Sequence, residues 1–418
     1  MISAEFLQDP YPDYRSLQEA GAIHWSEDFF GGAWLLTRYA DVTAVLRDPR
    51  FSVQRVGRWL NSCGPGAREQ LVEFKRIFAR AMLFFDGPSH ARLRKAVGDG
   101  FRPSILKDMA PRIRGIVDHL LDSIESQASA DFMQDFARPL PALVIADMLD
   151  IDSADRADFI AWSDDIAAFI GSPQPTLDLA LRAQSSSIAL NDYFRSLLPL
   201  RRNAPGDDLI GRLIRAQGEG QVITEKELVA QCAMLLFAGH ETTRNLLGNG
   251  LYWLLRHRDQ WTRLRDDPQL MPAAVREMLR FDSPIQYTAR RIYAEVQMHG
   301  RTLKRGQLLV PLIGAANRDP ARFSDPDRFD IGRDEGMHLS FGHGPHVCIG
   351  AALTTMEAEI AFSTLMRRLP MLELASPVAD WSGNPVYRGL ATLPLRTNRR
   401  SAASPQSAAG CGSAHDRC

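Results

Sequence analysis

One long helical segment constrains the fold of this chain more than any other feature. Thr224-Glu-Lys-Glu227 is a capping box, in which the Thr hydroxyl and the Glu carboxylate satisfy the first free amides of a helix. From there the sequence runs without proline to about Arg258, which predicts a helix roughly 50 Å long at ~1.5 Å per residue. Its middle, Cys232 to Gly239, is apolar on every face, as expected of a helix that passes through a core.

A polar island, Gly239-His-Glu-Thr-Thr243, interrupts that apolar helix near its centre. A glycine inside a helix costs about 1 kcal/mol relative to alanine, and a buried carboxylate costs more unless it is paired. One interpretation is a solvent-facing turn of a long helix. The other is a locally opened helix, whose Glu241 and Thr242 serve chemistry at the centre of the protein.

Most of the remaining sequence is also helical in pattern. Apolar residues recur at three- and four-residue spacing in several segments, including 106–126, 178–198 and 271–281. Strand-type alternation is concentrated in 285–313. Because strands and helices do not alternate along the chain, the pattern predicts a mostly α fold with a smaller β region (α+β), forming a single domain over residues 1–396.

Composition excludes several classes of function. Among 418 residues, 49 Lys and Arg face 50 Asp and Glu, which argues against nucleic acid or an anionic membrane as the main partner. No apolar run approaches the ~20 residues of a membrane span, and the first residues do not resemble a secretory signal. The five cysteines form no C-x-x-C pair or disulfide framework. A cytoplasmic protein is expected, with a disordered tail over 397–418, where large apolar residues are almost absent.

The second informative stretch is Phe341-Gly-His-Gly-Pro-His-Val-Cys-Ile-Gly350. Its glycines permit an irregular backbone that can approach a flat ligand closely. Cys348 directly precedes a helical pattern, and the amides and dipole at a helix N-terminus favour thiolate over thiol. Such a thiolate is a good ligand for a soft or redox-active metal. A zinc site formed with the neighbouring histidines is disfavoured, because structural zinc sites use two short ligand pairs and no second pair exists here.

Taken together, five motifs resemble the cytochromes P450, specifically the soluble bacterial class. Phe341–Gly350 matches the heme-binding cysteine loop of that family, F-x-x-G-x-H-x-C-x-G, at every fixed position. The four other motifs precede it in the family's order: His90–Arg94 (H-x-x-x-R), Ala238–Thr243 (A-G-x-E/D-T-T), Glu277–Arg280 (E-x-x-R) and Pro326–Phe329. The likeness extends from about Asp9 to Leu395.

The resemblance implies the cytochrome P450 fold, with heme b (iron protoporphyrin IX) between the long central oxygen-activating helix and the cysteine-loop helix. Cys348 would be the axial thiolate ligand of the heme iron. The heme propionates would be held by four side chains, His90, Arg94, Arg290 and His346. The adjacent Arg291 is an alternative to Arg290. A structural ion network behind the cysteine loop would consist of Glu277, Arg280 and Arg328.

The implied activity is that of a heme-thiolate monooxygenase of secondary metabolism. It would insert one oxygen atom from O2 into a mid-sized lipophilic molecule of terpenoid, polyketide or fatty acyl type. Glu241 and Thr242 would relay protons through a carboxylate and a hydroxyl. Substrate contacts are expected from the loop 55–85 and from five apolar residues, Met234, Phe237, Ala238, Ile285 and Leu390. The alternatives are a peroxide-driven heme enzyme of the same fold and a non-catalytic heme-binding sensor.

Electrons must come from another protein, because the sequence contains neither a G-x-G-x-x-G motif nor an iron–sulfur cysteine cluster. The resemblance implies a ferredoxin with its ferredoxin reductase. Four basic residues fall near the expected docking face: Arg92, Lys95, Arg102 and Lys107. A solvated helix face explains these charges equally well.

Overall fold

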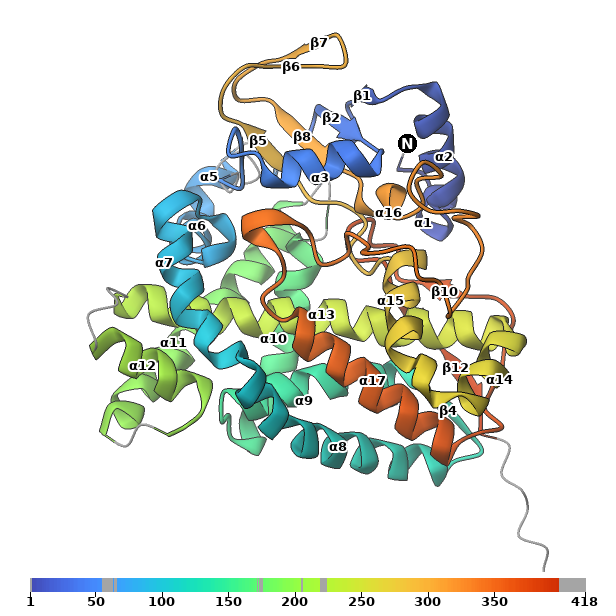
Figure 1. The fold of residues 1–418 in the computed structure, drawn as a ribbon. Coiled ribbons are helices and arrows are strands. Elements are labelled where there is room, and N and C mark those ends of the chain that lie inside the picture. The colour runs from blue at the N-terminus through green and yellow to red at the C-terminus, as the bar shows by residue number, and fades with distance from the viewer. Residues whose placement is uncertain are drawn as a thin grey trace, which may run out of the picture.

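The computed structural model describes residues 2–54, 63, 66–170, 172, 176–203, 206–218 and 224–397. Most of them are helical, and the largest sheet lies at one end of the molecule (Figure 1). The predicted mostly α fold with a smaller β region is therefore confirmed.

The α-helices follow one another along the chain as α1 (Ala4–Gln8), α2 (Tyr11–Ala20), α3 (Tyr39–Arg47), α5 (Ala67–Gln70), α6 (Val72–Phe78), α7 (Gly87–Gly98), α8 (Pro103–Glu125), α9 (Pro139–Met148), α10 (Arg156–Ile170), α11 (Leu177–Asn203), α12 (Leu209–Gly218), α13 (Glu225–Arg256), α14 (Arg258–Asp266), α15 (Met271–Phe281), α16 (Ile313–Ala316) and α17 (Ala351–Arg368). A short 3-10 helix, η1 (Met82–Phe84), precedes α7. The segments predicted to be helical correspond to α8, α11, α13 and α15.

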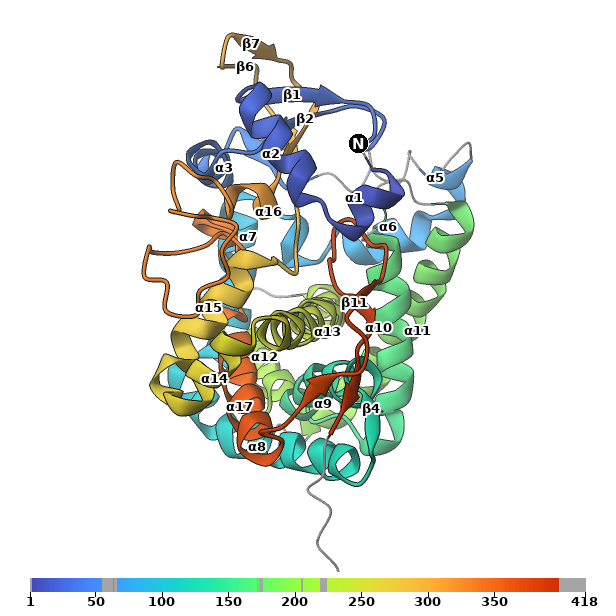
Figure 2. The same cartoon turned by 90° about the vertical axis from the view of Figure 1, so that its right-hand side faces the viewer.

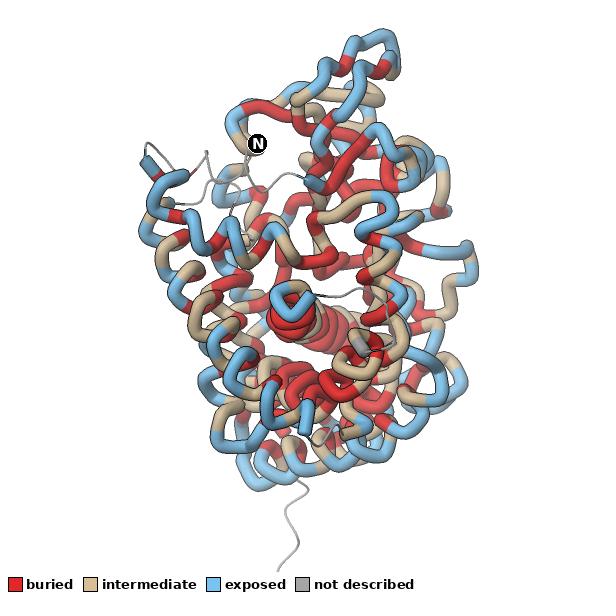
Figure 3. The backbone as a smooth tube through the Cα atoms, turned by 90° about the vertical axis from the view of Figure 1, so that its left-hand side faces the viewer, coloured by how far each residue is buried: buried red, intermediate tan, exposed pale blue. Residues whose placement is uncertain are grey.

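Helix α13 is the long central helix that the sequence predicted. Its capping box is complete: the Glu227 amide donates to Thr224 Oγ1 (3.2 Å), and the Thr224 amide donates to Glu227 Oε2 (2.9 Å). The helix passes through the middle of the molecule, viewed along its axis in Figure 2, and is buried along most of its length in Figure 3. Helices α9, α10, α11, α15 and α17 all pack against it.

Helix α13 is continuous from Glu225 to Arg256, so the polar island does not open the helix locally. That part of the second interpretation is wrong. Gly239 has a packing reason instead. A Cβ built there would lie 2.9 Å from Cδ1 of Ile145 in α9, so the glycine permits α9 to approach α13 closely. The cost of a glycine within a helix is thus explained by the close packing of two helices.

Five strands form the main sheet, in the order β1-β2-β8-β5-β3. Their bounds are β1 (Ile23–Ser26), β2 (Ala33–Leu36), β3 (Phe51–Ser52), β5 (Arg290–Ile292) and β8 (Leu308–Pro311). Strands β2 and β8 are parallel, with Ala33 opposite Leu308, and the other pairs are antiparallel. The sequence pattern located β5 and β8 but not the N-terminal strands β1, β2 and β3, and strand length does not explain the difference, since β5 has three residues and β1 and β2 have four.

Smaller β elements complete the fold. Strands β6 (Val296–Met298) and β7 (Arg301–Leu303) form a hairpin, β10 (Asp380–Trp381) pairs with β11 (Leu390–Thr392), and β12 (Pro394–Arg396) lies between β4 (Ser129–Asp131) and β9 (Glu373–Leu374).

The predicted tail begins one residue too early. Thr397 is buried, and its hydroxyl donates to the Gln127 carbonyl (2.7 Å), so this residue belongs to the folded domain. The rest of the predicted tail, 398–418, lies outside the described residues. In the described part of the chain, no helix has the length and apolar character required to cross a membrane.

Candidate active site

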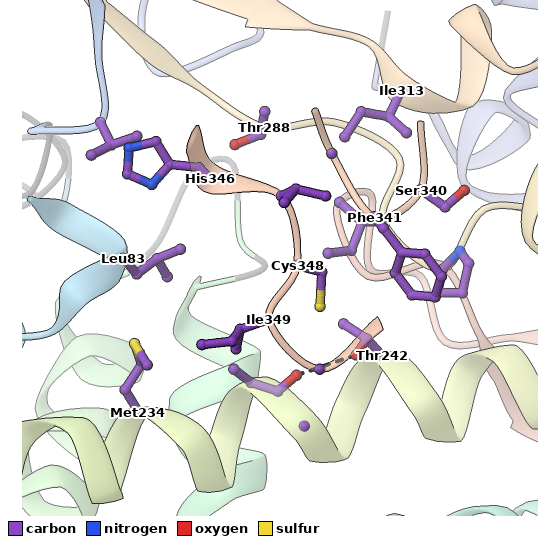
Figure 4. Close-up of a pocket in the computed structure, with 18 of the residues that line it drawn as sticks. Leu83, Met234, Thr242, Thr288, Ile313, Ser340, Phe341, His346, Cys348 and Ile349 are labelled. Atoms are coloured by element: carbon purple, nitrogen blue, oxygen red, sulfur yellow. Dashed lines mark hydrogen bonds between the residues drawn. The ribbon is translucent and has the colours of Figure 1, made fainter. Parts of the chain in front are cut away.

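A cavity of about 330 Å³ lies between α13 and the loop that carries Cys348. Figure 4 shows Sγ of Cys348 directed toward α13, with Thr242 on the facing turn of that helix. The walls are mostly apolar, and they combine residues from α13, η1, the 285–290 strand region and the cysteine loop. The fold therefore brings together the two sequence motifs that resemble an oxygen-activating helix and a heme-binding loop.

The cysteine loop has the irregular backbone that its glycines predict. Gly342 and Gly344 have φ of 71° and 75°, which L side chains rarely adopt. A Cβ at Gly344 would also lie 2.8 Å from the Leu46 carbonyl oxygen. The Cys348 amide donates to the Phe341 carbonyl (2.8 Å), which closes the loop and holds the cysteine at the start of α17.

The Cys348 thiol is surrounded by groups that act in opposite directions on its pKa. Burial raises the pKa, whereas hydrogen bonds from the Gly350 and Ala351 amides and the charge of Arg94 lower it. Burial is the larger influence for the thiol alone. A bound metal cation reverses that balance, because a coordinating thiol loses its proton outright.

Four basic side chains line the same cavity: His90, Arg94, Arg290 and His346. The rings of His90 and His346 lie with their centroids 4.0 Å apart. Burial, with the neighbouring charges of His346 and Arg94, lowers the pKa of His90 to about 4. Arg290 is buried and donates to Thr288 Oγ1 (3.1 Å), whereas Arg291 is exposed and does not line the cavity. Of the two adjacent arginines, the structure therefore places Arg290 at the site.

This donor set fits a heme group. The Cys348 thiol faces a mostly apolar chamber, as a ligand of heme iron would require. Two arginines and two histidines line the same chamber and could pair with the two propionate carboxylates of a heme. The close approach of the loop to Leu46, which a Cβ at Gly344 would block, keeps the thiol in this position.

The predicted acid–alcohol pair is divided between the cavity and the interior. Thr242 lines the cavity, and its hydroxyl donates to the Ala238 carbonyl (3.2 Å) within α13. Glu241 does not line it. Its carboxylate accepts hydrogen bonds from Arg244 (3.0 Å) and Asn245 (3.3 Å), which explains how a charge is accommodated in an apolar helix.

A further acid, Glu357 of α17, lines the cavity and was missed at the sequence level. Its side chain is 2% exposed, and Oε2 has no hydrogen-bond partner among the described residues. Burial raises the pKa of Glu357 well above its ordinary value of 4.5. The helical spacing offered a signal, because Glu357 follows Leu353 by four positions and shares its inward face.

Replacing Glu357 with glutamine is expected to remove a pH dependence of stability. The unfolded carboxyl ionises near pH 4.5 but the folded one does not, so the free energy of unfolding of the native protein falls as pH rises above 4.5. Glu357→Gln should lack this decline when urea midpoints are compared at pH 5 and pH 8. The exposed Glu373→Gln is the control. An identical midpoint change in native and Glu357→Gln proteins would show that Glu357 ionises normally.

The ion network behind the cysteine loop differs in one member from the prediction. Glu277 and Arg280 form a bidentate pair (2.7 and 2.8 Å) with almost no exposed surface. The predicted third member, Arg328, has an exposed side chain and contributes only its carbonyl. Arg333 takes its place, donating to Glu277 Oε1 (3.4 Å) from a side chain that is 9% exposed.

The predicted substrate contacts are largely brought together. Met234, Phe237, Ala238 and Ile285 line the cavity. Leu390 of β11 is fully buried in the hydrophobic core and does not line it. Of the predicted loop 55–85, the described residues form α5, α6 and η1, and Met82, Leu83 and Phe84 line the cavity. Residues 55–62, 64 and 65 lie outside the described residues.

The predicted docking residues are of two kinds. Arg92 pairs with Glu227 (2.6 Å) and Arg102 with Asp99 (2.7 Å), so their charges are partly neutralised. Lys95 and Lys107 are exposed. Of these four residues, only Lys95 and Lys107 have no ion-pair partner among the described residues.

Comparison with known proteins agrees with the site. Residues 28–378 match the family model "Cytochrome P450". The chain is 39% identical to the cytochrome P450 monooxygenase PikC of Streptomyces venezuelae, over 95% of this chain and 93% of the relative. It is 36% identical to a vitamin D(3) 25-hydroxylase of Pseudonocardia autotrophica, over 96% and 97%.

Solved structures give the same result. The P450BioI structure in complex with an acyl carrier protein ligated to hexadec-9Z-enoic acid has a TM-score of 0.86 and 34% identity, over 94% of this chain and all of that chain. Myxobacterial CYP267B1 in complex with myristic acid has a TM-score of 0.87 and 35% identity, over 95% and 98%. The cysteine loop, the central helix and these likenesses together place the chain in the cytochrome P450 family, as a heme-binding monooxygenase of the bacterial type.

Proposed function

We propose that this protein inserts one atom of O2 into a mid-sized lipophilic molecule, with electrons supplied by a ferredoxin and its reductase. The cavity carries the proposal. The cavity has mostly apolar walls, with the Cys348 thiol on one side and the Thr242 hydroxyl on the opposite side. Such a chamber excludes water from the reaction and binds an apolar substrate through burial of its surface.

Each group of residues has a distinct part in this proposal. Bound heme with an axial thiolate supplies the activation of O2. Cys348 would hold the iron, and the basic side chains of His90, Arg94, Arg290 and His346 would hold the propionates. The apolar side chains of Met234, Phe237, Ala238 and Ile285 orient the substrate. Glu277, Arg280 and Arg333 stabilise the fold behind the cysteine loop.

Proton delivery is assigned to α13. Thr242 Oγ1 lies in the cavity, and rotation away from the Ala238 carbonyl would let its hydroxyl donate a hydrogen bond into the cavity. Glu241 precedes Thr242 in the sequence, and its carboxylate accepts hydrogen bonds from Arg244 and Asn245. We assign it the supply of protons to Thr242 through water, which requires the Arg244 pair to open.

The substrate class follows from the walls and from the relatives. Structures similar to this one were solved with a fatty acyl chain carried by an acyl carrier protein, with testosterone and with tirandamycin C. All these ligands have extended apolar surface, which the residues lining this cavity would match. A polyketide, terpenoid or fatty acyl compound is therefore proposed, and the exposed Lys95 and Lys107 are proposed to attract an acidic ferredoxin.

Thr242→Ala is expected to uncouple electron consumption from product formation. Without the hydroxyl, proton delivery at the reacting oxygen fails, so product per electron should fall by about 10-fold or more, since one general acid typically contributes roughly 100-fold or more to a rate. Hydrogen peroxide should rise to match. The measurement follows product, peroxide and NADPH together, using a surrogate ferredoxin pair and a substrate found by spin-state titration.

Thr243→Ala is the matched control. Its hydroxyl contacts Thr354 Oγ1 (3.3 Å) and does not line the cavity, so coupling should stay at the wild-type level. Wild-type coupling in Thr242→Ala would contradict the proton-delivery role. Turnover with added peroxide but none with O2 and reductant would favour the alternative of a peroxide-driven enzyme.

A further inference from the structure

One buried amide connects the central helix to the segment that forms a wall of the cavity. Gln231 of α13 has no exposed surface. Its Oε1 accepts from the Met82 amide (2.8 Å), and its Nε2 donates to the carbonyls of Arg80 (2.8 Å) and Glu227 (2.9 Å). The amide oxygen and the amide nitrogen of Gln231 are therefore both hydrogen-bonded. Two of the three bonds go to the backbone of Arg80 and Met82, between the end of α6 and the first residue of η1.

The backbone position of this turn determines where the next residues, which form one wall of the cavity, are placed. Met82, Leu83 and Phe84 follow it directly and all line the cavity. The Arg80 C=O lies just beyond the end of α6, and the Met82 N–H belongs to the first residue of η1, where backbone groups lack helical partners. Because buried backbone groups must find partners, removing the Gln231 amide would force the turn to shift or to admit water.

A second glutamine supports the same segment from another side. Gln184 of α11 accepts from the Phe74 amide (3.0 Å) and donates to the Gln70 carbonyl (3.0 Å). Residues 67–84, here called the wall segment, are thus tied by side-chain amides to α11 near the start of α6 and to α13 at its end. Only the Gln231 contact is adjacent to residues that line the cavity.

We propose that Gln231 is a positioning residue for substrate selection: it sets the Met82–Phe84 wall and thereby the shape of ligand that the cavity accepts. The inference rests on the proposed role of the cavity as the substrate site. Gln231 itself is not among the residues that line the cavity, so its effect on ligands passes through the wall segment.

The test compares two ligands that bind the iron in the same way but differ in size. Imidazole and 4-phenylimidazole are titrated into the heme-loaded protein, and each dissociation constant is read from the Soret shift. In Gln231→Met, which keeps the side-chain length but no hydrogen bond, imidazole binding should stay within about 2-fold. Binding of 4-phenylimidazole should weaken by about 10-fold, since its ring requires a formed wall. Gln231→Glu keeps an acceptor for the Met82 amide, so its dissociation constant for 4-phenylimidazole should lie between those of the wild type and Gln231→Met.

The matched control is Asn249→Leu. Asn249 is another buried amide of α13, but it donates to the Arg388 carbonyl (3.0 Å), away from the wall segment. Its loss should lower thermal stability and leave the ratio of the two dissociation constants unchanged. An unchanged ratio in Gln231→Met, or an equal change in Asn249→Leu, would overturn the proposal. If Gln231→Met does not retain heme, the ratio in Gln231→Glu decides. Failure of both azoles to bind the wild-type protein would instead contradict the cavity as the substrate site.

Discussion

Cys348→Ala is expected to abolish both the red-shifted Soret band of the reduced carbon-monoxide complex and all monooxygenase activity. The thiol of Cys348 faces the cavity opposite α13, and alanine offers no ligand to the iron. The variant would also lack the electron donation that a thiolate ligand would supply to favour O–O cleavage. The measurement is the reduced carbon-monoxide difference spectrum, with heme content determined separately as the pyridine hemochrome.

Cys232→Ala provides the control for cysteine replacement. Cys232 is fully buried in α13, and burial raises its pKa to about 12, so it is an inert thiol of the core. This variant should keep the red-shifted band at full intensity. A red-shifted band that survives in Cys348→Ala would rule out Cys348 as the axial ligand.

Arg280→Met is expected to cost about 3–5 kcal/mol in free energy of unfolding, which is typical when one partner of a buried ion pair is removed. The guanidinium is 3% exposed, and besides Glu277 it binds the carbonyls of Asn317 (2.9 Å), Pro326 (2.8 Å) and Arg328 (3.2 Å). Methionine leaves these three oxygens and the Glu277 carboxylate short of donors. Since whole proteins are stable by only about 5–15 kcal/mol, a loss of this size is a large fraction of the total free energy of unfolding.

Urea unfolding followed by far-UV circular dichroism measures this effect. The exposed pair of Arg182 and Asp178 is the control, and Arg182→Ala should cost less than about 1 kcal/mol. The double variant Glu277→Met/Arg280→Met should recover part of the loss, because no buried carboxylate is left unpaired and Arg333 keeps its ion pair with Glu335. A cost below about 1 kcal/mol for Arg280→Met would show that the network does not stabilise the fold.

Features that the sequence predicted correctly are those encoded by neighbouring residues. The capping box at Thr224 and the apolar run after it specify α13 without reference to any other segment. The same holds for the cysteine loop, where glycines, Cys348 and the following helix lie within ten positions. Local chemistry of this kind does not depend on how distant parts of the chain pack.

The predictions that were wrong depend on distant packing. Arg328 and Arg333 carry the same charge five positions apart, and the folded path of the chain decides which side chain reaches Glu277. Similarly, Leu390 and Ile285 are both apolar, and the sequence alone cannot separate a core residue from one that lines a cavity.

The central position of α13 has a consequence for how a substrate enters the cavity. A helix packed on several sides by other helices belongs to the most stable cooperative unit of a protein, and its amides exchange with solvent only when the whole unit unfolds. Opening of the cavity therefore cannot come from α13 itself. It must come from elements that can separate from α13 without unfolding it, and the energy of that separation sets the rate at which large ligands enter.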